Sequence, residues 1–262
     1  MPGDPTFDLQ SHSTHSDGAL APAEVVKRAA DAGVKLFALT DHDTVAGVPE
    51  ALAAARVKNI DVVPAVELSS VHADAEDLHL LGYDLDHTDS TLLDALEDFR
   101  ADRIRRIAEM AERLEIEVPD HPSPGRPHLA DQLQRRHPDM TRDELFAAYL
   151  TPGAPTYVRR TRPTVAQAIE IVHAAGGLAV WAHPYWDVAE PRLDDFPGLD
   201  GVEVFYPSHS EEQTRALYAA ARERGLLTTG SADFHGPAHE HFNRFLAFRL
   251  YGLEPDLGRL GQ

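Results

Sequence analysis

In the first third of the chain, short apolar runs alternate with amphipathic stretches. The apolar runs at residues 7–9, 34–39, 60–66 and 78–83 are typical of buried strands. Between the first two runs, residues 22–32 carry apolar side chains at helical spacing, begin with a proline and are followed by a glycine, as helices commonly are. This alternation predicts βαβ units and therefore a parallel sheet or an α/β barrel.

The pattern changes after residue 88. Apolar residues recur at helical spacing from Leu92 to Leu114, which predicts one long helix. The following stretch is rich in proline and basic residues, with further helical segments near 129–136 and 142–150. We interpret residues 89–158 as a helical insertion.

The strand and helix rhythm resumes after the insertion. Strands are expected at residues 178–182, 201–205 and 226–229. The chain is therefore predicted to form one α/β barrel from residues 1–88 and 159–262, interrupted by the insertion.

Composition restricts the chemistry that such a barrel can perform. The chain has no cysteine, so any metal must be bound by imidazole and carboxylate groups, which suit zinc, manganese, iron or magnesium. The formal net charge of -19 argues against a broad basic groove for duplex nucleic acid. It does not exclude a small anionic substrate, because cations bound to carboxylates invert the local charge.

The start of the chain lacks a basic and apolar leader, and nowhere do 18 consecutive apolar residues occur. A cytoplasmic protein without a membrane segment is expected. The sequence does not indicate its oligomeric state.

Histidine and carboxylate side chains stand in or just after the predicted strands. They are His12, Asp17, Asp41, His42, Asp43, Glu67, His79, His183, His209, Asp233 and His235. Barrel enzymes assemble their active sites at strand ends, and unpaired charges there would cost stability. The pattern favours a multinuclear metal site, although Asp17 and Asp233 could instead cap turns. Such a site activates water and neutralises phosphate oxygens.

Several motifs resemble those of the polymerase-and-histidinol-phosphatase (PHP) family across nearly the whole chain. They are DLQSHS at residues 8–13, SDG at 16–18, TDHD at 40–43, Glu67, and GSADFH at 230–235. Segments 125–128 and 182–184 resemble those of the stand-alone PHP phosphoesterases related to nucleoside 3',5'-bisphosphate phosphatase and to a 5'-to-3' exoribonuclease.

The resemblance implies a distorted (β/α)7 barrel with a helical insertion and two or three divalent ions (Mn, Zn, Fe or Mg). It assigns one ion to His12, Glu67 and Asp233, a second to Glu67, His79 and His183, and a third to Asp17, His42 and His235. The implied reaction is metal-dependent hydrolysis of a phosphomonoester or terminal phosphodiester of a nucleotide or short oligonucleotide, by a hydroxide that bridges metal ions.

The chain departs from the family pattern at Gln10. The family has His-x-His where this chain has Gln10-Ser11-His12. An amide oxygen is a weaker ligand than imidazole for most of these metals, so the first ion is expected to bind loosely or to be absent. His15 is a less favoured replacement ligand.

Basic residues in and after the insertion are candidates for binding the substrate. Arg126, His128, Arg159 and Arg160 are predicted to contact phosphate, because guanidinium groups pair bidentately with phosphate oxygens. Other arginines here, Arg135, Arg136 and Arg162, are expected to be exposed surface charges.

Three further residues are candidates for catalysis. Asp41 and Asp43 flank His42 and could orient its ring or transfer a proton to the leaving group. His209 follows a predicted strand and precedes a helix, so it could bind the substrate or assist the reaction.

Alternative functions are a histidinol-phosphate-type phosphatase, another amidohydrolase-like barrel hydrolase, and a weakened metal-binding or sensing domain. The basic insertion favours a substrate with several phosphates over a cationic amino-alcohol phosphate. Gln10 is the feature that supports a sensing role.

Overall fold

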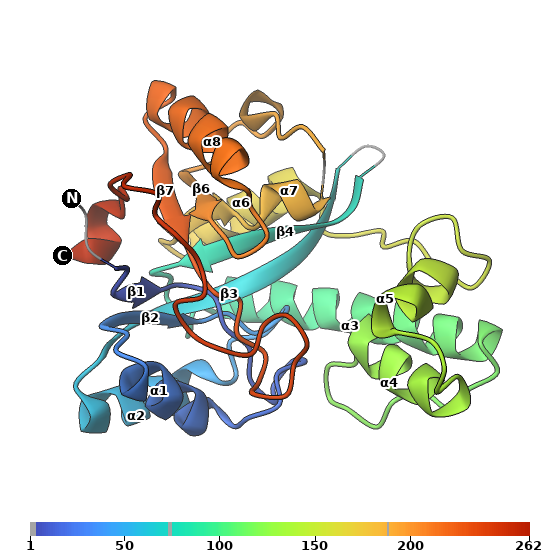
Figure 1. Cartoon of the computed structure of the whole chain (residues 1–262). Coiled ribbons are helices and arrows are strands. Elements are labelled where there is room, and N and C mark those ends of the chain that lie inside the picture. The colour runs from blue at the N-terminus through green and yellow to red at the C-terminus, as the bar shows by residue number, and fades with distance from the viewer. Residues whose placement is uncertain (1–3, 73–74, 188) are drawn as a thin grey trace.

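The computed structural model describes residues 4–72, 75–187 and 189–262 (Figure 1). Within these ranges, seven strands form one sheet in sequence order. The strands are β1 (Phe7–Asp8), β2 (Leu36–Leu39), β3 (Asp61–His72), β4 (Ala75–Tyr83), β5 (Leu178–Trp181), β6 (Gly201–Phe205) and β7 (Leu227–Gly230).

The two ends of the sheet meet just after β1 and β7. The backbone nitrogen of Leu9 donates to the carbonyl of Gly230 (3.2 Å), and that of His12 donates to Phe234 (2.8 Å). These bonds nearly close the sheet into a barrel, which confirms the predicted distorted barrel. They also bring the segment that carries His12 against the segment that carries Asp233.

Strand β4 is antiparallel to both of its neighbours, β3 and β5, whereas the remaining strand pairs are parallel. The expectation of a parallel sheet is wrong here, because only two residues separate β3 from β4 and a parallel crossover needs a dozen or more. Strand β3 is also longer than predicted. Its pairing with β4 sets Glu67 opposite Leu81 and Ser69 opposite His79, within the strands and not at their ends.

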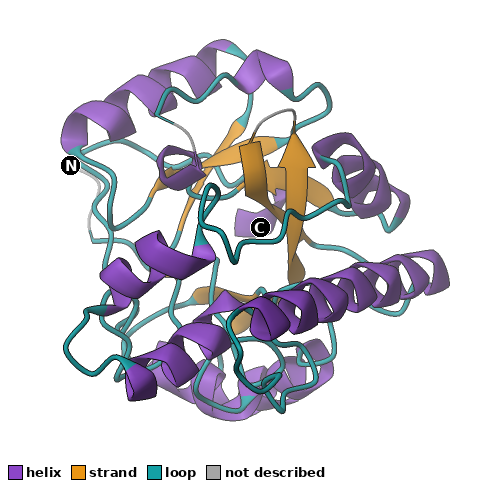
Figure 2. Ribbon diagram, turned by 90° about the vertical axis from the view of Figure 1, so that its right-hand side faces the viewer, coloured by secondary structure: helices purple, strands orange, loops and turns teal. Residues whose placement is uncertain are grey.

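Helices cover the outside of the strands (Figures 1 and 2). They are α1 (Pro22–Asp31), α2 (Val48–Lys58), α6 (Val165–Ala174), α7 (Pro184–Asp187) and α8 (Glu211–Glu223), with short 3-10 turns at Leu193–Asp195 and Gly258–Gly261. Helices α1 and α2 pack on each other beside β2 and β3, whereas α8 packs on β6 and β7. Both groups bury apolar faces against the sheet.

The inserted region projects to one side of the barrel (Figure 1). It contains α3 (Ser90–Arg113), α4 (Arg126–Arg136), α5 (Arg142–Leu145) and a π-helical turn at Phe146–Leu150. The far half of α3 packs with these elements around a hydrophobic cluster of its own. The cluster comprises Ile107, Met110, Ala111, Leu129, Ala130, Leu133, Leu145, Leu150, Tyr157 and Val158.

Among the helices of the described residues, none is both long and apolar enough to cross a membrane.

The cluster in the insertion should depend on Leu129, which is fully buried. Leu129→Ala is expected to lower the free energy of unfolding by about 2–5 kcal/mol, because it removes apolar contacts and leaves a cavity. The matched control is Leu93→Ala on α3, where the leucine is 43% exposed and the expected change is within about 0.5 kcal/mol. Urea denaturation followed by circular dichroism measures both values; equal losses would contradict the assignment of this core.

Candidate metal centre

The side chains predicted as metal ligands converge from separate segments on one cavity of about 430 Å³. The loop after β1 supplies His12 and Asp17, and the loop after β2 supplies His42. Glu67 and His79 come from the paired strands β3 and β4, and His183 follows β5. The remaining ligand candidates, Asp233 and His235, lie in the segment after β7.

Glu67 lies at the centre of the group, and its two oxygens face different histidines. Its Oε1 is 2.7 Å from Nδ1 of His79 and 3.3 Å from Nε2 of His183. Its Oε2 is 3.0 Å from Nε2 of His12, and the same nitrogen is 3.1 Å from Oδ1 of Asp233. One buried carboxylate therefore contacts ligand candidates from three separate segments, the loop after β1, strand β4 and the segment after β5.

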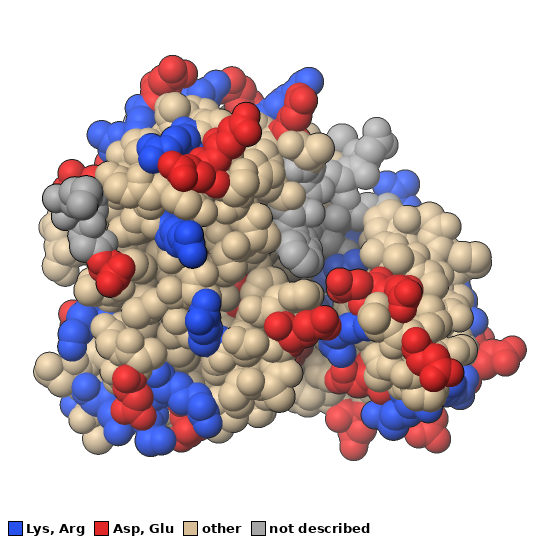
Figure 3. Space-filling view, viewed as in Figure 1, with Lys and Arg blue, Asp and Glu red and all other residues tan. Residues whose placement is uncertain are grey.

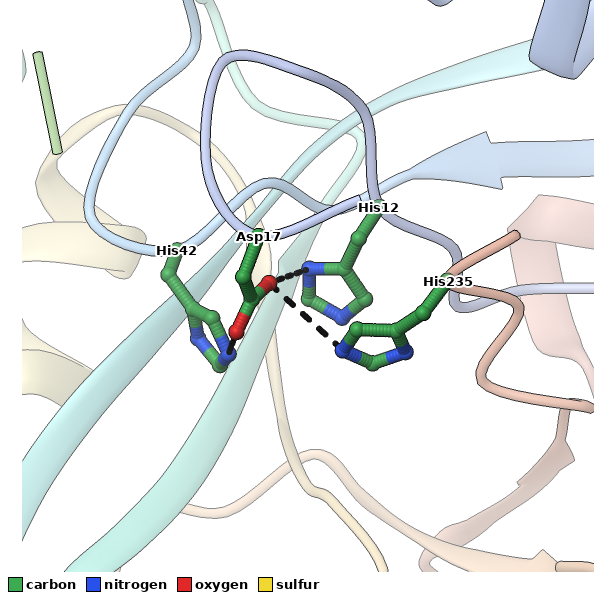
Figure 4. A group of neighbouring side chains, drawn as sticks. All are labelled: His12, Asp17, His42 and His235. Carbon is green, nitrogen blue, oxygen red and sulfur yellow. Dashed lines mark ion pairs between the residues drawn. The ribbon is translucent and has the colours of Figure 1, made fainter. Parts of the chain in front are cut away.

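Asp17 is the centre of a second group, shown in Figure 4. Its Oδ1 lies 3.5 Å from Nδ1 of His12 and 3.5 Å from Nε2 of His235. Its Oδ2 lies 3.5 Å from Nε2 of His42. The separations exceed those of good hydrogen bonds, and they suit atoms that share a bound cation.

Several buried polar atoms in this cavity make no hydrogen bond within the described residues. They are Nε2 of His12, Oδ1 of Asp17, Nδ1 of His42 and Oδ1 of Asp233. Buried polar atoms without partners are costly and therefore rare in proteins. Because these atoms face one another, divalent cations would satisfy all of them, so the residues fit bound metal.

Three sets of ligand atoms lie close enough to hold an ion, with every atom of a set within 4.8 Å of the others. The sets are His12, Asp17, His42 and His235; His42, Glu67 and His79; and His12, Glu67 and Asp233. The last set is the one that the sequence resemblance implies. The second has His42 where His183 was expected, although His183 lies 3.3 Å from both Glu67 and His79.

The charges in the site support ligand chemistry at neutral pH. Burial opposes ionisation of Glu67 and Asp233, but neighbouring histidines outweigh it. They hold the pKa of Glu67 well below its usual range and that of Asp233 at about 2. Burial lowers the pKa of His42 to about 3, which leaves its ring neutral, as a ligand must be. Burial also opposes the charge on His12, yet the carboxylates of Asp233 and Glu67 close to its Nε2 raise its pKa well above the ordinary value, so a cation would displace a proton there.

Three residues in or beside the site have strained backbone. Asp43 (φ 53°), His183 (φ 28°) and Asp233 (φ 53°) adopt positive φ values that residues other than glycine rarely take. Each is held by specific partners: Arg103 on Asp43, the Glu203 carboxyl group on the His183 nitrogen, and the Tyr206 hydroxyl on Asp233. The fold thus fixes these side chains before any ligand binds.

Asp41 and Asp43 are buried and do not line the cavity. The carboxylate of Asp41 accepts bonds from the Ser13 nitrogen (2.7 Å) and from the hydroxyls of Ser13 (2.6 Å) and Ser16 (2.7 Å). It therefore fixes the loop that presents Asp17. Asp43 accepts from Nε of Arg103 at 2.8 Å. A direct catalytic role for either residue stays a prediction.

His209 also lies outside the cavity lining. Its Nδ1 is 3.0 Å from the carbonyl of Val204, and its ring packs against Tyr185 and Tyr206. Burial lowers the pKa of His209 to about 4, so the ring is neutral and Nδ1 donates to that carbonyl. His209 contacts the site only through Tyr206 among the residues described above. A role of His209 in substrate binding or catalysis stays a prediction. His15, the replacement ligand considered above, lines a separate groove.

Of the predicted substrate-binding residues, Arg126 and Arg160 line the cavity. His128 does not; its Nδ1 accepts from the Gly125 nitrogen at the start of α4, and its ring stacks on His121. Arg159 is exposed and is also absent from the lining.

Sequence reasoning missed other residues that line the cavity: Arg103, Arg106, Arg142, Phe146, Tyr206, His239, His241 and Phe242. The sequence pattern contained a signal for two of these residues. Arg103 and Arg106 lie on the same helical face as Phe99, Ile107 and Met110, where an exposed arginine is not expected.

The sequence profile of the family described as "PHP domain" matches residues 8–194. The chain belongs to the PHP domain family. The 5'-3' exoribonuclease of Haemophilus influenzae is 33% identical over 250 residues, which cover 88% of this chain and 90% of that protein. The 3',5'-nucleoside bisphosphate phosphatase of Chromobacterium violaceum is 34% identical over 250 residues, which cover 88% of this chain and 87% of that protein.

The fold comparison agrees with the sequence comparison. A solved structure from Bifidobacterium adolescentis, described as a metal-dependent phosphoesterase, has a TM-score of 0.83 and 26% identity and covers 99% of this chain and 96% of that one. These findings confirm the predicted family, the predicted barrel and the predicted class of enzyme, a metal-dependent hydrolase of phosphoric esters.

Glu203 beneath the site provides a test of the electrostatics. Burial raises the pKa of its carboxyl to about 8, whereas an unfolded glutamate titrates near about 4.3. The native metal-free state therefore retains a proton that the unfolded chain loses, and stability falls as pH rises from the unfolded value through about 8. Glu203→Gln should remove this part of the pH dependence, so that the variant gains stability relative to the parent above pH 8.

Urea denaturation of chelator-treated protein between pH 5 and 9 measures the effect. The matched control is Glu212→Gln on α8, where the glutamate is exposed and the parent's pH dependence should persist. Parallel stability curves for Glu203→Gln and the parent would show that Glu203 is ionised in the folded chain.

Proposed function

We propose that this protein hydrolyses a phosphomonoester or terminal phosphodiester of a nucleotide or short oligonucleotide. One observation carries the proposal: the metal-ligand candidates and several arginines line the same cavity. Cations on one wall and guanidinium groups on another form a site for a substrate with more than one negative charge.

We propose further that the histidine and carboxylate cluster holds two or three divalent ions among Mn, Zn, Fe and Mg. The donor set of imidazoles and carboxylates suits these metals, and the buried atoms without hydrogen bonds support their presence. Bound divalent ions would lower the pKa of a water molecule and neutralise the oxygens of the reacting phosphate.

The arginine wall comes from the insertion and from the segment that leads out of it. Among the described residues it comprises Arg103, Arg106, Arg126, Arg142 and Arg160. Several of these side chains are already fixed: Nε of Arg106 donates to the carbonyl of Val158 (2.7 Å), and Nη2 of Arg103 donates to Ser69 (2.7 Å). Prepositioned guanidinium groups lose little freedom when they grip phosphate oxygens.

The distribution of charge and the size of the cavity both support a small anionic substrate. Figure 3 shows acidic and basic side chains interspersed over one face of the molecule. The net charge is -19, so the arginines in the cavity concentrate positive charge where the rest of the chain is acidic. A cavity of about 430 Å³ falls in the range that encloses small ligands.

The two named relatives support a nucleotide substrate in different forms. One is named for a nucleoside with phosphates at the 3' and 5' positions, and the other for removal of residues from the 5' end of RNA. Both substrates present one phosphate to be cleaved and a second negative group nearby. The arginine wall supplies a partner for that second group.

Asp41 and Asp43 act in this proposal by positioning other residues. Asp41 holds the loop that carries Asp17, and Asp43 ties α3 of the insertion to the segment that carries His42. His209 supports Tyr206, whose hydroxyl holds Asp233 at 2.8 Å.

A substrate panel tests the function. Nucleotides with 3'-phosphate, 5'-phosphate and both, and short 5'-phosphorylated oligoribonucleotides, are incubated with Mn²⁺ while free phosphate and nucleosides are measured. Turnover of at least one nucleotide class is expected, with loss of activity after chelation and recovery on adding Mn²⁺. Turnover of a sugar or amino-alcohol phosphate alone would refute the nucleotide assignment. Release of nitrogen from amide substrates would favour an amidohydrolase. Bound metal without turnover of any substrate would favour a sensing role.

The arginine wall is tested by Arg126→Leu. Loss of a charged hydrogen bond to phosphate costs about 1.5–3 kcal/mol, so KM for a bisphosphate should rise roughly tenfold to a hundredfold, with a much smaller change for a monophosphate. The matched control is Arg135→Leu on the same helix, where the arginine is exposed and KM should not change. Steady-state kinetics on both substrates measure the effect; equal changes in KM for the two substrates would contradict it.

A further inference from the structure

Gln10 is fully buried beside the ligand cluster, two residues before His12. Its amide Nε2 donates a hydrogen bond to Oε2 of Glu67 at 3.0 Å. That oxygen is the same one that lies 3.0 Å from Nε2 of His12. The amide therefore presents its hydrogen, and not its oxygen, toward the place where His12, Glu67 and Asp233 meet.

The orientation of this amide is fixed from behind. The hydroxyl of Ser231 lies 3.3 Å from Oε1 of Gln10 and 2.6 Å from Oε1 of Glu203, and its hydrogen can serve either oxygen. Glu203 in turn accepts from the backbone nitrogen of His183 at 2.9 Å. A buried chain of polar groups thus runs from His183 to Glu67. A reversed amide would place its oxygen against the Glu67 carboxylate, which would be repulsive.

We propose that Gln10 positions Glu67 and thereby makes the cation site formed by His12, Glu67 and Asp233 the weakest of the cluster. This inference rests on the proposed metal-dependent function. The hydrogen bond from Gln10 occupies a lone pair of Oε2 that a cation in this site would use, and a neutral amide nitrogen is not a ligand. The site therefore has three ligands and a competing donor.

The other cation sites do not have this competition. The set around Asp17 draws on His42 and His235 as well as His12, and Gln10 bonds none of these residues. In the set of His42, Glu67 and His79, Oε1 of Glu67 lies 2.7 Å from His79 and 3.3 Å from His183, and it is not the oxygen that Gln10 bonds. The chain consequently holds two cations firmly, and the third exchanges with free metal. Its occupancy follows the metal concentration around the protein.

Metal binding in the absence of substrate tests this inference. Chelator-stripped protein is titrated with Mn²⁺ by calorimetry and by the electron paramagnetic resonance signal of free Mn²⁺, and the Mn²⁺ retained after dialysis is counted. The unmodified chain should retain two ions and bind a third more weakly. Gln10→His, which offers a ring nitrogen, should tighten the third site about tenfold or more and raise the retained number to three.

Gln10→Glu is the matched variant, because it keeps the size of the side chain and replaces the N–H donor with an oxygen ligand. It should also tighten the third site, whereas an amide that already bound metal through its oxygen would gain little from it. A retained number other than two in the unmodified chain, or unchanged affinity of the weak site in both folded variants, would overturn the inference. Because phosphate release is not measured here, failure of the proposed function would appear separately in the substrate panel.

Discussion

The attraction between one buried carboxylate and the imidazoles around it organises this protein. Glu67 has almost no exposure to solvent, and burial of an unpaired charge would cost far more than the net stability of a domain. His12, His79 and His183 supply the compensation from three separate segments, at 2.7–3.3 Å. The barrel must therefore bring the end of β1, the middle of β4 and the end of β5 together around β3. The strained backbone at His183 and Asp233 shows what this convergence costs.

The reversed strand β4 makes that convergence possible. If β3 were joined to a parallel strand through a helix, the next ligand would lie at the end of that strand and only after the residues of the helix. The tight β3 and β4 pair instead places His79 two positions from Glu67 across the ladder, so both side chains project into one cavity from within the sheet. Closure between β1 and β7 then adds His12 and Asp233 from the other side.

Local pattern was enough to predict the long helix and the ends of most strands, and it selected ligand candidates that the structure brings to one cavity, because each depends on periodicity or on a short motif. The reversed strand was not predicted, because apolar runs carry no direction and the length of the β3 and β4 segments was underestimated. The buried arginines were missed for a related reason. Arg103 is stabilised by Asp43, which is sixty residues earlier in the chain, and a helical period does not show such a partner. Its place on an otherwise apolar face was the available clue.

The same arginine explains why the insertion belongs to the site. Arg103 binds Asp43 beside His42 and also Ser69 on β3, so α3 is anchored to two of the segments that carry ligands. The ligand candidates include three carboxylates, Asp17, Glu67 and Asp233, which line the same cavity as the arginines. Two divalent ions would more than neutralise those carboxylates and turn the acidic floor positive. A third ion would add positive charge where the arginines already attract phosphate. In the proposal above, Gln10 weakens the site of His12, Glu67 and Asp233 through its bond to Glu67. It thereby limits the positive charge in a cavity from which the product phosphate must leave.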